Sequence, residues 1–529
     1  MAAKNPAVIG LLLQEFRQKT KFVGVKAGNE YYLEVAKEAL PEVSSYLIKH
    51  LRASLATMIG NDERGINGSF RLYYYFAVNF EEIFIVMTIA INPTEPAFPS
   101  ITPSVPAAHW YEREVQDMFG LKPVGHPDPR SLVLHHDWSQ GTHPLRKDFD
   151  SDSLEKMPSP DYHFGEIKGS GPFYLPVGPI HAGIIEPGHF RFSVAGETVL
   201  NLEARLFYTH RGVEKLAEGS TLAGVLALAE RTCGACAFSH SVSFCHAIER
   251  IGNVQIPDRA LSIRAILLEM ERLYNHIGDV GNICAGVGLA LGTSHGNRIK
   301  EAILQLNQGL TGSRFLRGIN TIGGLKKDIA DQQLASLDTQ LKQLTEDFID
   351  LAEVLLDHDS LIQRLRGTGR LSLVAVQDLG VVGPAARASG CTKDWRKDFP
   401  YGIYGQLDFE VAREEAGDVL ARFKVRINEA VTSFKIISQL ICQIPTGPVV
   451  HPVGELLPYQ AALGWSESAR GSNLHWVMIG PNNTVYRYRI RSASYCNWPA
   501  VPLAVQGNLV PDFPLINKSF ELCYACTDR

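Results

Sequence analysis

Four of the nine cysteines fall into two Cys-x-x-Cys pairs that are far apart in the chain. The first pair, Cys233 and Cys236, lies in "ERTCGACAFSH" (230–240), and the second pair, Cys523 and Cys526, lies in the last ten residues, "FELCYACTDR". Two thiolates separated by two residues can face one metal ion, and two such pairs supply the four soft ligands that zinc, iron or nickel accept. The pairs therefore predict one metal site that two remote segments build together.

The distance between the pairs in sequence bears on the kind of site. A zinc ribbon places its pairs ~15–20 residues apart, far closer than Cys236 and Cys523, so a small structural zinc knuckle is disfavoured. Two independent pairs that share no metal remain open on spacing alone. A thioredoxin-like redox role is less favoured, because neither pair opens a helix after a strand in a short βαβ unit.

Composition excludes several classes of protein. The chain has 529 residues and a net charge of −5, which gives no electrostatic reason to expect a nucleic-acid partner. No apolar stretch approaches the ~18 residues of a transmembrane helix, and the short run "AVIGLLL" near the N-terminus lacks a signal-peptide cleavage site. Nine cysteines in a chain of this length do not form a disulfide framework, so we expect a protein of the reducing cytoplasm.

Hydrophobic patterns divide the chain at a polar segment. Residues 1–150 predict a small α/β domain with a helix near 5–18 and strands at 70–78 and 81–91. Residues 151–172 are rich in Ser, Pro, Gly and charge, which is typical of a linker.

Residues 173–529 predict a larger, mainly α-helical catalytic domain with peripheral β structure. Its start, at 190–212, is strand-like, and 446–515 return to short strands and turns. Helical spacing of apolar residues predicts three long helices, with Asp258 as the N-cap candidate of the first, at 258–280, 330–360 and 408–443. The fold class that follows is a multidomain α+β protein.

The residues around the cysteines resemble the large, catalytic subunit of nickel–iron hydrogenases. That family carries R-x-C-G-x-C-x-x-x-H in its first motif, matched here by Arg231, Cys233, Gly234, Cys236 and His240. Its second motif is usually D-P-C-x-x-C, with His or Arg three positions after the last cysteine, where Arg529 stands here. In the family a protease cleaves at that position after nickel insertion, so the resemblance implies that this chain is the mature form.

Further motifs resemble one branch of that family. The stretches "GPIHAGIIEPGHFRF" (178–192), "LFYTHRGVEKLAE" (206–218) and the passage 105–149 are similar to the membrane-associated, energy-converting (group 4) hydrogenases of the formate hydrogenlyase type. In these proteins a domain resembling a complex I peripheral-arm subunit precedes the catalytic domain. The resemblance implies an enzyme that interconverts H2 with protons and electrons and, in a formate hydrogenlyase, evolves H2. The electron donor, whether formate, carbon monoxide or ferredoxin, is left open.

By position in the family motifs, the four cysteines would hold a nickel–iron centre. Cys233 and Cys523 would be terminal nickel ligands, and Cys236 and Cys526 would bridge to an iron that carries carbon monoxide and cyanide. Soft thiolates suit a metal that must bind hydride, and Cys523 would be the first proton acceptor. The alternative for all four residues is a structural zinc site.

The resemblance assigns roles to four more residues. Glu186 resembles the proton-relay glutamate, although a glutamate on a surface turn is the alternative. Arg470 in "ESARGSNLHW" resembles the arginine that binds a cyanide ligand, and Ser494 could bind the other cyanide; an exposed arginine and a strand-end serine are the alternatives. Glu521, with Cys523, Glu186 and Arg470, is an expected catalytic residue, but Glu521-Leu522 replaces the usual Asp-Pro, so the position of the longer carboxylate beside the metals is in question.

The other cysteines lack the spacing of an iron–sulfur cluster, so we expect none in this chain. The resemblance implies an iron–sulfur small subunit as electron partner, further electron-transfer and membrane subunits, and nickel-insertion and C-terminal protease maturation factors. It also implies peripheral attachment to the cytoplasmic side of the inner membrane. Two other functions are kept: a complex I-like quinone-reducing subunit without nickel, and a structural zinc-binding assembly subunit.

Overall fold

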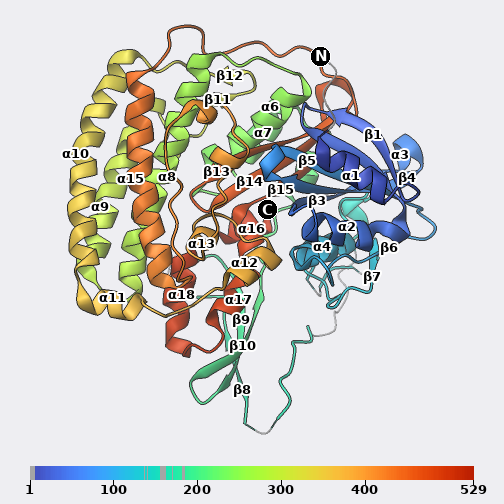
Figure 1. Ribbon diagram of the computed structural model, residues 1–529, viewed down its shortest axis with the longest axis horizontal. Helices are drawn as coiled ribbons and strands as arrows, with labels where there is room; N and C mark the ends of the chain where they lie inside the picture. The colour runs from blue at the N-terminus through green and yellow to red at the C-terminus, as the bar shows by residue number, and fades with distance from the viewer. Residues whose placement is uncertain (1–5, 136, 140, 155–161, 170, 182–184) are drawn as a thin grey trace.

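A computed structural model describes residues 6–135, 137–139, 141–154, 162–169, 171–181 and 185–529 (Figure 1). Long helices form a layer on one side, and a mixed sheet formed by the N-terminal residues lies on the other. Cys526 of the second cysteine pair is in the last helix, α19 (Tyr524–Asp528), and Cys523 directly precedes it; the C-terminus lies between these two parts in this view. The multidomain α+β class is therefore confirmed.

The N-terminal sheet has the strand order β1-β2-β5-β4-β3, in which only the neighbours β2 and β5 run parallel. Its strands are β1 (Thr20–Lys26), β2 (Glu30–Val35), β3 (Ser54–Glu63), β4 (Ser69–Val78) and β5 (Ile83–Ile91). The predicted strands at 70–78 and 81–91 are confirmed, and the predicted helix near 5–18 is shorter. The helices of this part are α1 (Ala7–Glu15), α2 (Leu40–Lys49), α3 (Arg64–Asn67) and α4 (His109–Phe119), and two short strands, β6 (Ala97–Pro99) and β7 (Lys122–Val124), pair with each other.

A second, antiparallel sheet joins this part to the rest of the protein. It consists of β13 (Ala461–Ser468), β14 (Gly471–Ile479) and β15 (Val485–Arg491), and both β13 and the central strand β14 are buried along their whole length. Trp476 on β14 donates its indole N–H to the Tyr75 hydroxyl on β4 at 2.9 Å, and Phe84 on β5 stacks on Phe399 with ring centroids 4.7 Å apart. One apolar core therefore continues from the N-terminal sheet into the larger part.

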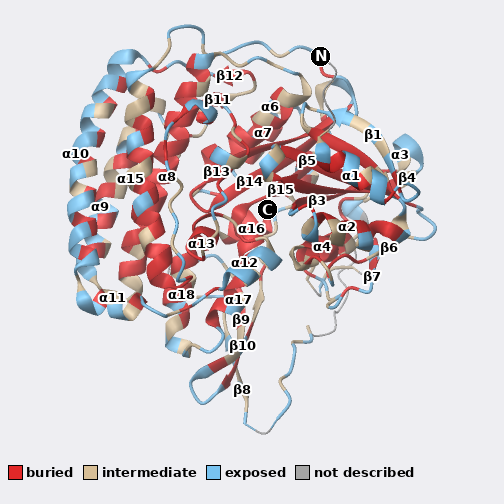
Figure 2. Ribbon diagram, viewed as in Figure 1, coloured by how far each residue is buried: buried red, intermediate tan, exposed pale blue. Residues whose placement is uncertain are grey.

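Four long helices make the opposite layer: α8 (Asp258–Gly286), α9 (Ala290–Thr311), α10 (Asp331–Leu356) and α15 (Val419–Cys442). The predicted helices at 258–280 and 330–360 are confirmed, the latter as α10 followed by α11 (Asp359–Leu365). Asp258 is the first helical residue and Pro257 the cap, so the N-cap prediction is wrong. Helix α8 is buried on nearly every face, whereas α10 buries one stripe, because α8 lies inside the layer and α10 at its edge (Figure 2).

Two helix predictions need correction. The predicted helix 408–443 begins only at Val419, because the Asp418 side chain accepts the Ala421 N–H at 2.8 Å and caps it there. Residues 446–515 contain the predicted strands but also helices. These are α16 (Ala493–Asn497), which the Ser492 side chain caps, α17 (Ala500–Val505) and the start of α18 (Phe513–Phe520).

The remaining elements connect these layers. The predicted strand-like segment 190–212 contains β9 (His189–Ala195) and β10 (Thr198–Arg205), which form a projecting sheet with β8 (Phe173–Val177) (Figure 1). The others are α5 (Val213–Ala217), α6 (Leu222–Ala229), α7 (Ala237–Ile251), β11 (Asn320–Thr321), β12 (Gly324–Leu325), α12 (Leu373–Leu379), α13 (Gly383–Arg387), α14 (Trp395–Asp398) and α19 (Tyr524–Asp528).

Part of the predicted linker, residues 155–161 and 170, lies outside the described residues. In the described part of the linker, the His163 carbonyl accepts a hydrogen bond from Arg130 at 2.9 Å. This end of the linker therefore contacts the N-terminal part. Within the described residues, none of the helices combines the length and apolar character needed to cross a membrane.

A buried ion-pair cluster ties α8 and α15 to the second sheet. Among the described residues, its ion pairs join three guanidinium groups to four carboxylates, all at most 2% exposed: Arg272, Arg387, Arg396, Glu269, Asp394, Glu429 and Glu467. His276 also lies 3.0 Å from Glu429, but burial lowers its pKa to about 4, so this ring is neutral near pH 7. Burial and the nearby Asp394 charge raise the pKa of Glu467 to about 7, so Glu467 is the carboxylate that takes up a proton as the pH falls below about 7.

This proton gives a testable pH dependence. The pKa of Glu467 is higher in the folded state than in the unfolded chain. Raising the pH from about 4.5 to about 7 should therefore lower the free energy of unfolding, by on the order of 2–3 kcal/mol. Glu467→Gln should remove this slope and be near neutral at pH 7. Glu429→Gln, which weakens the carboxylate shared by Arg272 and Arg387, should cost about 3–5 kcal/mol. Urea unfolding at several pH values measures both, and equal losses in the two variants would contradict the assignment.

Candidate metal centre

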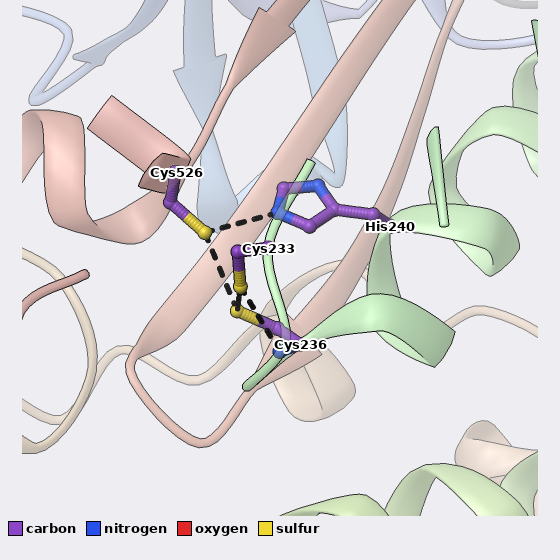
Figure 3. Close-up of side chains that lie close together, drawn as sticks. All are labelled: Cys233, Cys236, His240 and Cys526. Atoms are coloured by element: carbon purple, nitrogen blue, oxygen red, sulfur yellow. Dashed lines mark hydrogen bonds between the residues drawn. The ribbon is translucent and has the colours of Figure 1, made fainter. Parts of the chain in front are cut away.

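The two remote cysteine pairs meet in the interior. Cys233 Sγ lies 3.2 Å from Cys236 Sγ, and Cys236 Sγ lies 3.6 Å from Cys526 Sγ. With His240, their ligand atoms all fall within 4.8 Å of one another (Figure 3). The three cysteines are at most 3% exposed. The predicted single site built by two segments is therefore what the fold produces.

Cys523 completes the set from a less buried position. Its sulfur accepts the Cys526 N–H at 3.4 Å, and hydrogen bonding with the Cys233 thiol raises its pKa to about 12. In the other pair, the Cys233 sulfur accepts the Cys236 N–H at 3.2 Å. Each pair thus has the same local geometry, in which the backbone of the second cysteine binds the sulfur of the first.

Each pair lies at the start of a helix. Cys236 is the N-cap of α7 and Cys523 the N-cap of α19, where free N–H groups favour negative charge. Hydrogen bonds with Cys233 and Cys526 lower the pKa of Cys236 to about 6, opposite to the direction for Cys523. The two pairs therefore share a position in the fold but differ in thiol acidity.

Helix α8 supports the first cysteine pair with a polar stripe at helical spacing. Glu271 accepts the N–H groups of Phe238 (2.7 Å) and Ser239 (3.0 Å) in the first turn of α7, and burial raises its pKa to about 8. Asn275 donates to the Ala235 carbonyl at 2.7 Å, between the two cysteines. The loop that carries Cys233 and Cys236 is thereby fixed from one side.

The next residues of the same stripe hold Arg470. This buried guanidinium donates to Asn275 Oδ1 at 2.7 Å, to Asp279 Oδ1 at 3.1 Å and to the Glu521 carbonyl at 2.9 Å. Burial alone would lower the pKa of Arg470, but Asp279 and the Cys236 and Cys233 thiolates raise it. The arginine is therefore a fixed positive charge beside the sulfurs, and the alternative of an exposed arginine is wrong.

Glu521 lies at the edge of the same site. Its backbone has φ 52° and ψ 45°, the left-handed conformation that ends α18, and its carboxylate accepts from the Asn282 amide. A proline at position 522 would push residue 521 toward extended backbone, so Leu522 is compatible with this turn. Burial and the Asp279 charge raise the pKa of Glu521 to about 7. The Glu521 side chain, one methylene longer than aspartate, therefore still lies beside the residues that surround the cysteines.

Glu186 reaches the second cysteine pair from the outer side. Its carboxylate accepts the Ala525 N–H at 2.8 Å, although the residue is largely exposed. Partial burial and then the charge of Cys523 raise its pKa, against the Ala525 N–H, which lowers it. The neighbouring residues 182–184 lie outside the described part of the chain. Glu186 is thus close to Cys523 and to solvent at the same time.

Ser494 is also within the site. Its hydroxyl accepts the Cys523 N–H at 3.0 Å and is buried at the start of α16. Every residue that the sequence singled out therefore lies at one place: the four cysteines, Glu186, Arg470, Ser494 and Glu521.

Sequence reasoning missed the residues that support this set. Asn275 and Asp279 fall in the predicted helix 258–280 and were given no other role, Asn282 lies just beyond its predicted end, and His475, which lies behind His240, was not singled out. The signal was present for α8, because Glu271, Asn275, Asp279 and Asn282 recur at intervals of three and four residues, which places them on one face of the helix.

Three family descriptions match the chain. Residues 287–461 and 451–529 match "Respiratory-chain NADH dehydrogenase, 49 Kd subunit", and residues 33–155 match the 30 Kd subunit of the same enzyme. Residues 211–279, which contain the first cysteine pair, match "Nickel-dependent hydrogenase".

Known proteins resemble the chain over its full length. Formate hydrogenlyase subunit 5 of Escherichia coli (strain K12) is 39% identical, over 100% of this chain and 93% of that protein. Hydrogenase-4 component G of the same organism is 37% identical, over 100% of this chain and 92% of that protein. Among solved structures, a chain of an archaeal membrane-bound sulfane sulfur reductase matches 68% of this chain and 99% of its own length, with 28% identity and a TM-score of 0.64.

Asp279 lies between two buried arginines beside the metal site, and its replacement tests how much these ion pairs stabilise the protein. It pairs with Arg470 at 3.1 Å and with Arg426 at 2.6 Å. Asp279→Ala should cost about 3–5 kcal/mol, because both guanidiniums lose their shared carboxylate. Asp338→Ala, which removes a surface i,i+4 pair with Lys342 on α10, is the control and should cost less than about 1 kcal/mol. Urea unfolding followed by tryptophan fluorescence compares them; similar losses would sink the idea.

Proposed function

Because the chain belongs to the membrane-associated (group 4) nickel–iron hydrogenases of the formate hydrogenlyase type, as their large catalytic subunit, we propose that its four paired cysteines hold the nickel–iron centre that interconverts H2 with protons and electrons. The observation that carries this assignment is the convergence of two Cys-x-x-Cys pairs on one buried point.

The donor set fits this group. Four sulfurs with one face closed by Arg470 and the other reached by Glu186 can bind nickel and share two sulfurs with iron. By position in the motifs, Cys233 and Cys523 would be the terminal ligands and Cys236 and Cys526 the bridging ones, and the iron would carry carbon monoxide and cyanide. When bound, the centre would supply the two-electron chemistry that interconverts H2 with protons and electrons.

The chain's own residues provide the route for the proton. Cys523 is the most accessible of the four sulfurs, and Glu186 is anchored beside it by the Ala525 N–H. A carboxylate held at a ligand's flank but exposed on its other side can accept a proton from the site and release it outward. We therefore assign Cys523 as the first proton acceptor and Glu186 as the relay.

Arg470, Ser494 and Glu521 shape the pocket. Arg470 cannot deprotonate and offers directed donors, which suits a cyanide ligand, and the Ser494 hydroxyl suits the second one. Glu521 places a carboxylate, which Asn282 orients, beside Arg470. These three residues bind and orient, while proton transfer is left to Cys523 and Glu186.

Partners follow from what the chain itself offers. Its other five cysteines are scattered singly over α7, α8, α15, α16 and a loop, so we propose that the electrons pass to the iron–sulfur cluster of a small subunit. Further electron-transfer and membrane subunits, a nickel-insertion system and a C-terminal protease complete the proposal. We place the chain on the cytoplasmic side of the membrane, attached through partners, working toward H2 evolution.

We also propose that residues 1–150 and 173–529 are the two functional domains, joined by the linker 151–172. The charged residues of α4 are mostly buried: Glu112, Arg113, Glu114 and Asp117. Glu114 pairs with Arg529 at 3.0 Å, beside the second cysteine pair. The first domain therefore supports the metal site rather than offering these charges to a partner.

A complex I-like quinone-reducing role without nickel is the second candidate. The matches to both NADH dehydrogenase subunits favour it, since the fold is common to both functions. A quinone site has no need for four converging thiolates, so the hydrogenase assignment is preferred. A structural zinc site would use the same sulfurs and differs in the metal it binds.

The deciding experiment is nickel, iron and zinc quantification with an infrared spectrum of the same purified sample. We expect one nickel and one iron per chain, with carbon monoxide and cyanide bands. Cys523→Ser should abolish H2 production and the bands while the circular dichroism stays that of the wild type. Zinc alone, after co-expression with the maturation system, would refute the proposal.

Glu186→Gln tests the proton route. The amide cannot carry the proton, so H2/D2 exchange should slow by about 10²–10⁴-fold with unchanged nickel content. Glu197→Gln, on an exposed turn between β9 and β10, is the matched control and should exchange at the wild-type rate. Wild-type exchange in the Glu186 variant would remove this residue from the route.

A further inference from the structure

A chain of hydrogen bonds leads from Cys526 away from Glu186 into the interior. His240 Nε2 lies 3.4 Å from Cys526 Sγ, and His240 Nδ1 lies 2.8 Å from His475 Nε2. His475 Nδ1 in turn lies 2.6 Å from the Tyr488 hydroxyl. All four side chains are fully buried. The chain therefore connects one sulfur of the metal site to a tyrosine on β15 without passing through solvent.

The fold brings these side chains together from three elements. His240 lies one turn after Cys236 on α7, whose face packs on the second sheet. On that sheet His475 of β14 pairs with Ile490, and Val477 pairs with Tyr488 of β15, so His475 and Tyr488 are diagonal neighbours. Phe244, one turn further along α7, packs edge-on against the Tyr488 ring with centroids 5.6 Å apart. The geometry is thus fixed by packing.

The hydrogen bonds can have one consistent direction. Among the described residues, His475 is the one hydrogen-bond partner found for the Tyr488 hydroxyl, so the hydroxyl proton goes to His475 Nδ1. A neutral His475 then carries its proton on Nε2 and donates to His240 Nδ1. This leaves the His240 proton on Nε2, directed at the Cys526 sulfur.

Protonation states agree with this direction. Burial and then the neighbouring His240 lower the pKa of His475 well below its usual range, so this ring is neutral. Burial and the charge of Glu214 raise the pKa of Tyr488, so its hydroxyl keeps the proton that it must donate. Tyr488, His475 and His240 can therefore each donate one proton to the next residue of the chain.

We propose that Tyr488 and His475 are positioning residues that hold His240 in the tautomer whose Nε2–H donates to the Cys526 sulfur. This rests on the proposed function, in which Cys526 bridges nickel and iron. A donor on a bridging thiolate withdraws electron density from the sulfur and, through it, from the iron. Tyr488 and His475 then tune the electron density of the site from two residues away.

The infrared test uses the intact, matured protein. Tyr488→Phe removes only the hydroxyl, so His475 can adopt the other tautomer and the donor on Cys526 is weakened. With more electron density on iron, the carbon monoxide and cyanide bands should all shift to lower wavenumber, at unchanged nickel and iron content. Tyr486→Phe, on the same strand but bonded to the Asp62 carbonyl, should leave the bands in place. Unshifted bands in the Tyr488 variant overturn the inference.

A second measurement observes the tautomer directly. In the matured, metal-containing protein with ¹⁵N-labelled histidine, the two resonance pairs lost in His240→Gln and His475→Gln identify the rings. Protonated Nε2 and unprotonated Nδ1 on both rings support the proposal, and a proton on His475 Nδ1 overturns it. Absence of carbon monoxide and cyanide bands in the wild type would refute the proposed function instead, so the two failures are distinguishable.

Discussion

Buried guanidinium–carboxylate pairing is the interaction on which the metal site depends. Four thiolates in a dry interior concentrate negative charge, which burial alone makes costly. Arg470 supplies the compensating charge beside the sulfurs, and it is fixed there by Asp279, which also pairs with Arg426. Arg272, in the adjoining cluster, donates to the carbonyl of Ser468, two residues before Arg470. Helices α8 and α15 therefore carry the charged partners that fix Arg470 beside the sulfurs.

A second set of buried charges fixes the tail that carries Cys523 and Cys526. Arg529 pairs with Glu114 from α4 and with Glu214 from α5, and Arg489 on β15 pairs with the same two acids. Asp528 accepts the N–H groups of Phe207 and Thr209. Because Glu114 belongs to the N-terminal part, the two parts of the chain are coupled through the metal site. This explains physically why a small α/β unit accompanies the catalytic part.

The cysteines could be found from sequence because their paired spacing carries chemistry, whereas Glu186, Arg470, Ser494 and Glu521 were found through the resemblance of the short stretches around them to motifs of the family. Long periodic helices such as α8 and α10 were also predictable, since periodicity alone defines them. The start of α15 could not be predicted, because the helical spacing of apolar residues continues before Val419, whereas the Asp418 side chain caps the helix there. Asp279 and His475 were not predicted for another reason. The role of each depends on a hydrogen-bond partner about 190 to 240 residues away in sequence, and only the tertiary fold brings the partners together.

The metal site has two chemically different sides. Toward the surface, Cys523 and Glu186 are accessible, and a carboxylate there can exchange protons with the surroundings. Toward the interior, Cys526 faces His240 and, behind it, His475 and Tyr488, a closed chain with no exposed member. A group that must move protons needs contact with solvent, whereas a group that sets the electron density of a sulfur needs a fixed donor and a low dielectric. The fold separates these requirements by placing one cysteine of the same pair on each side.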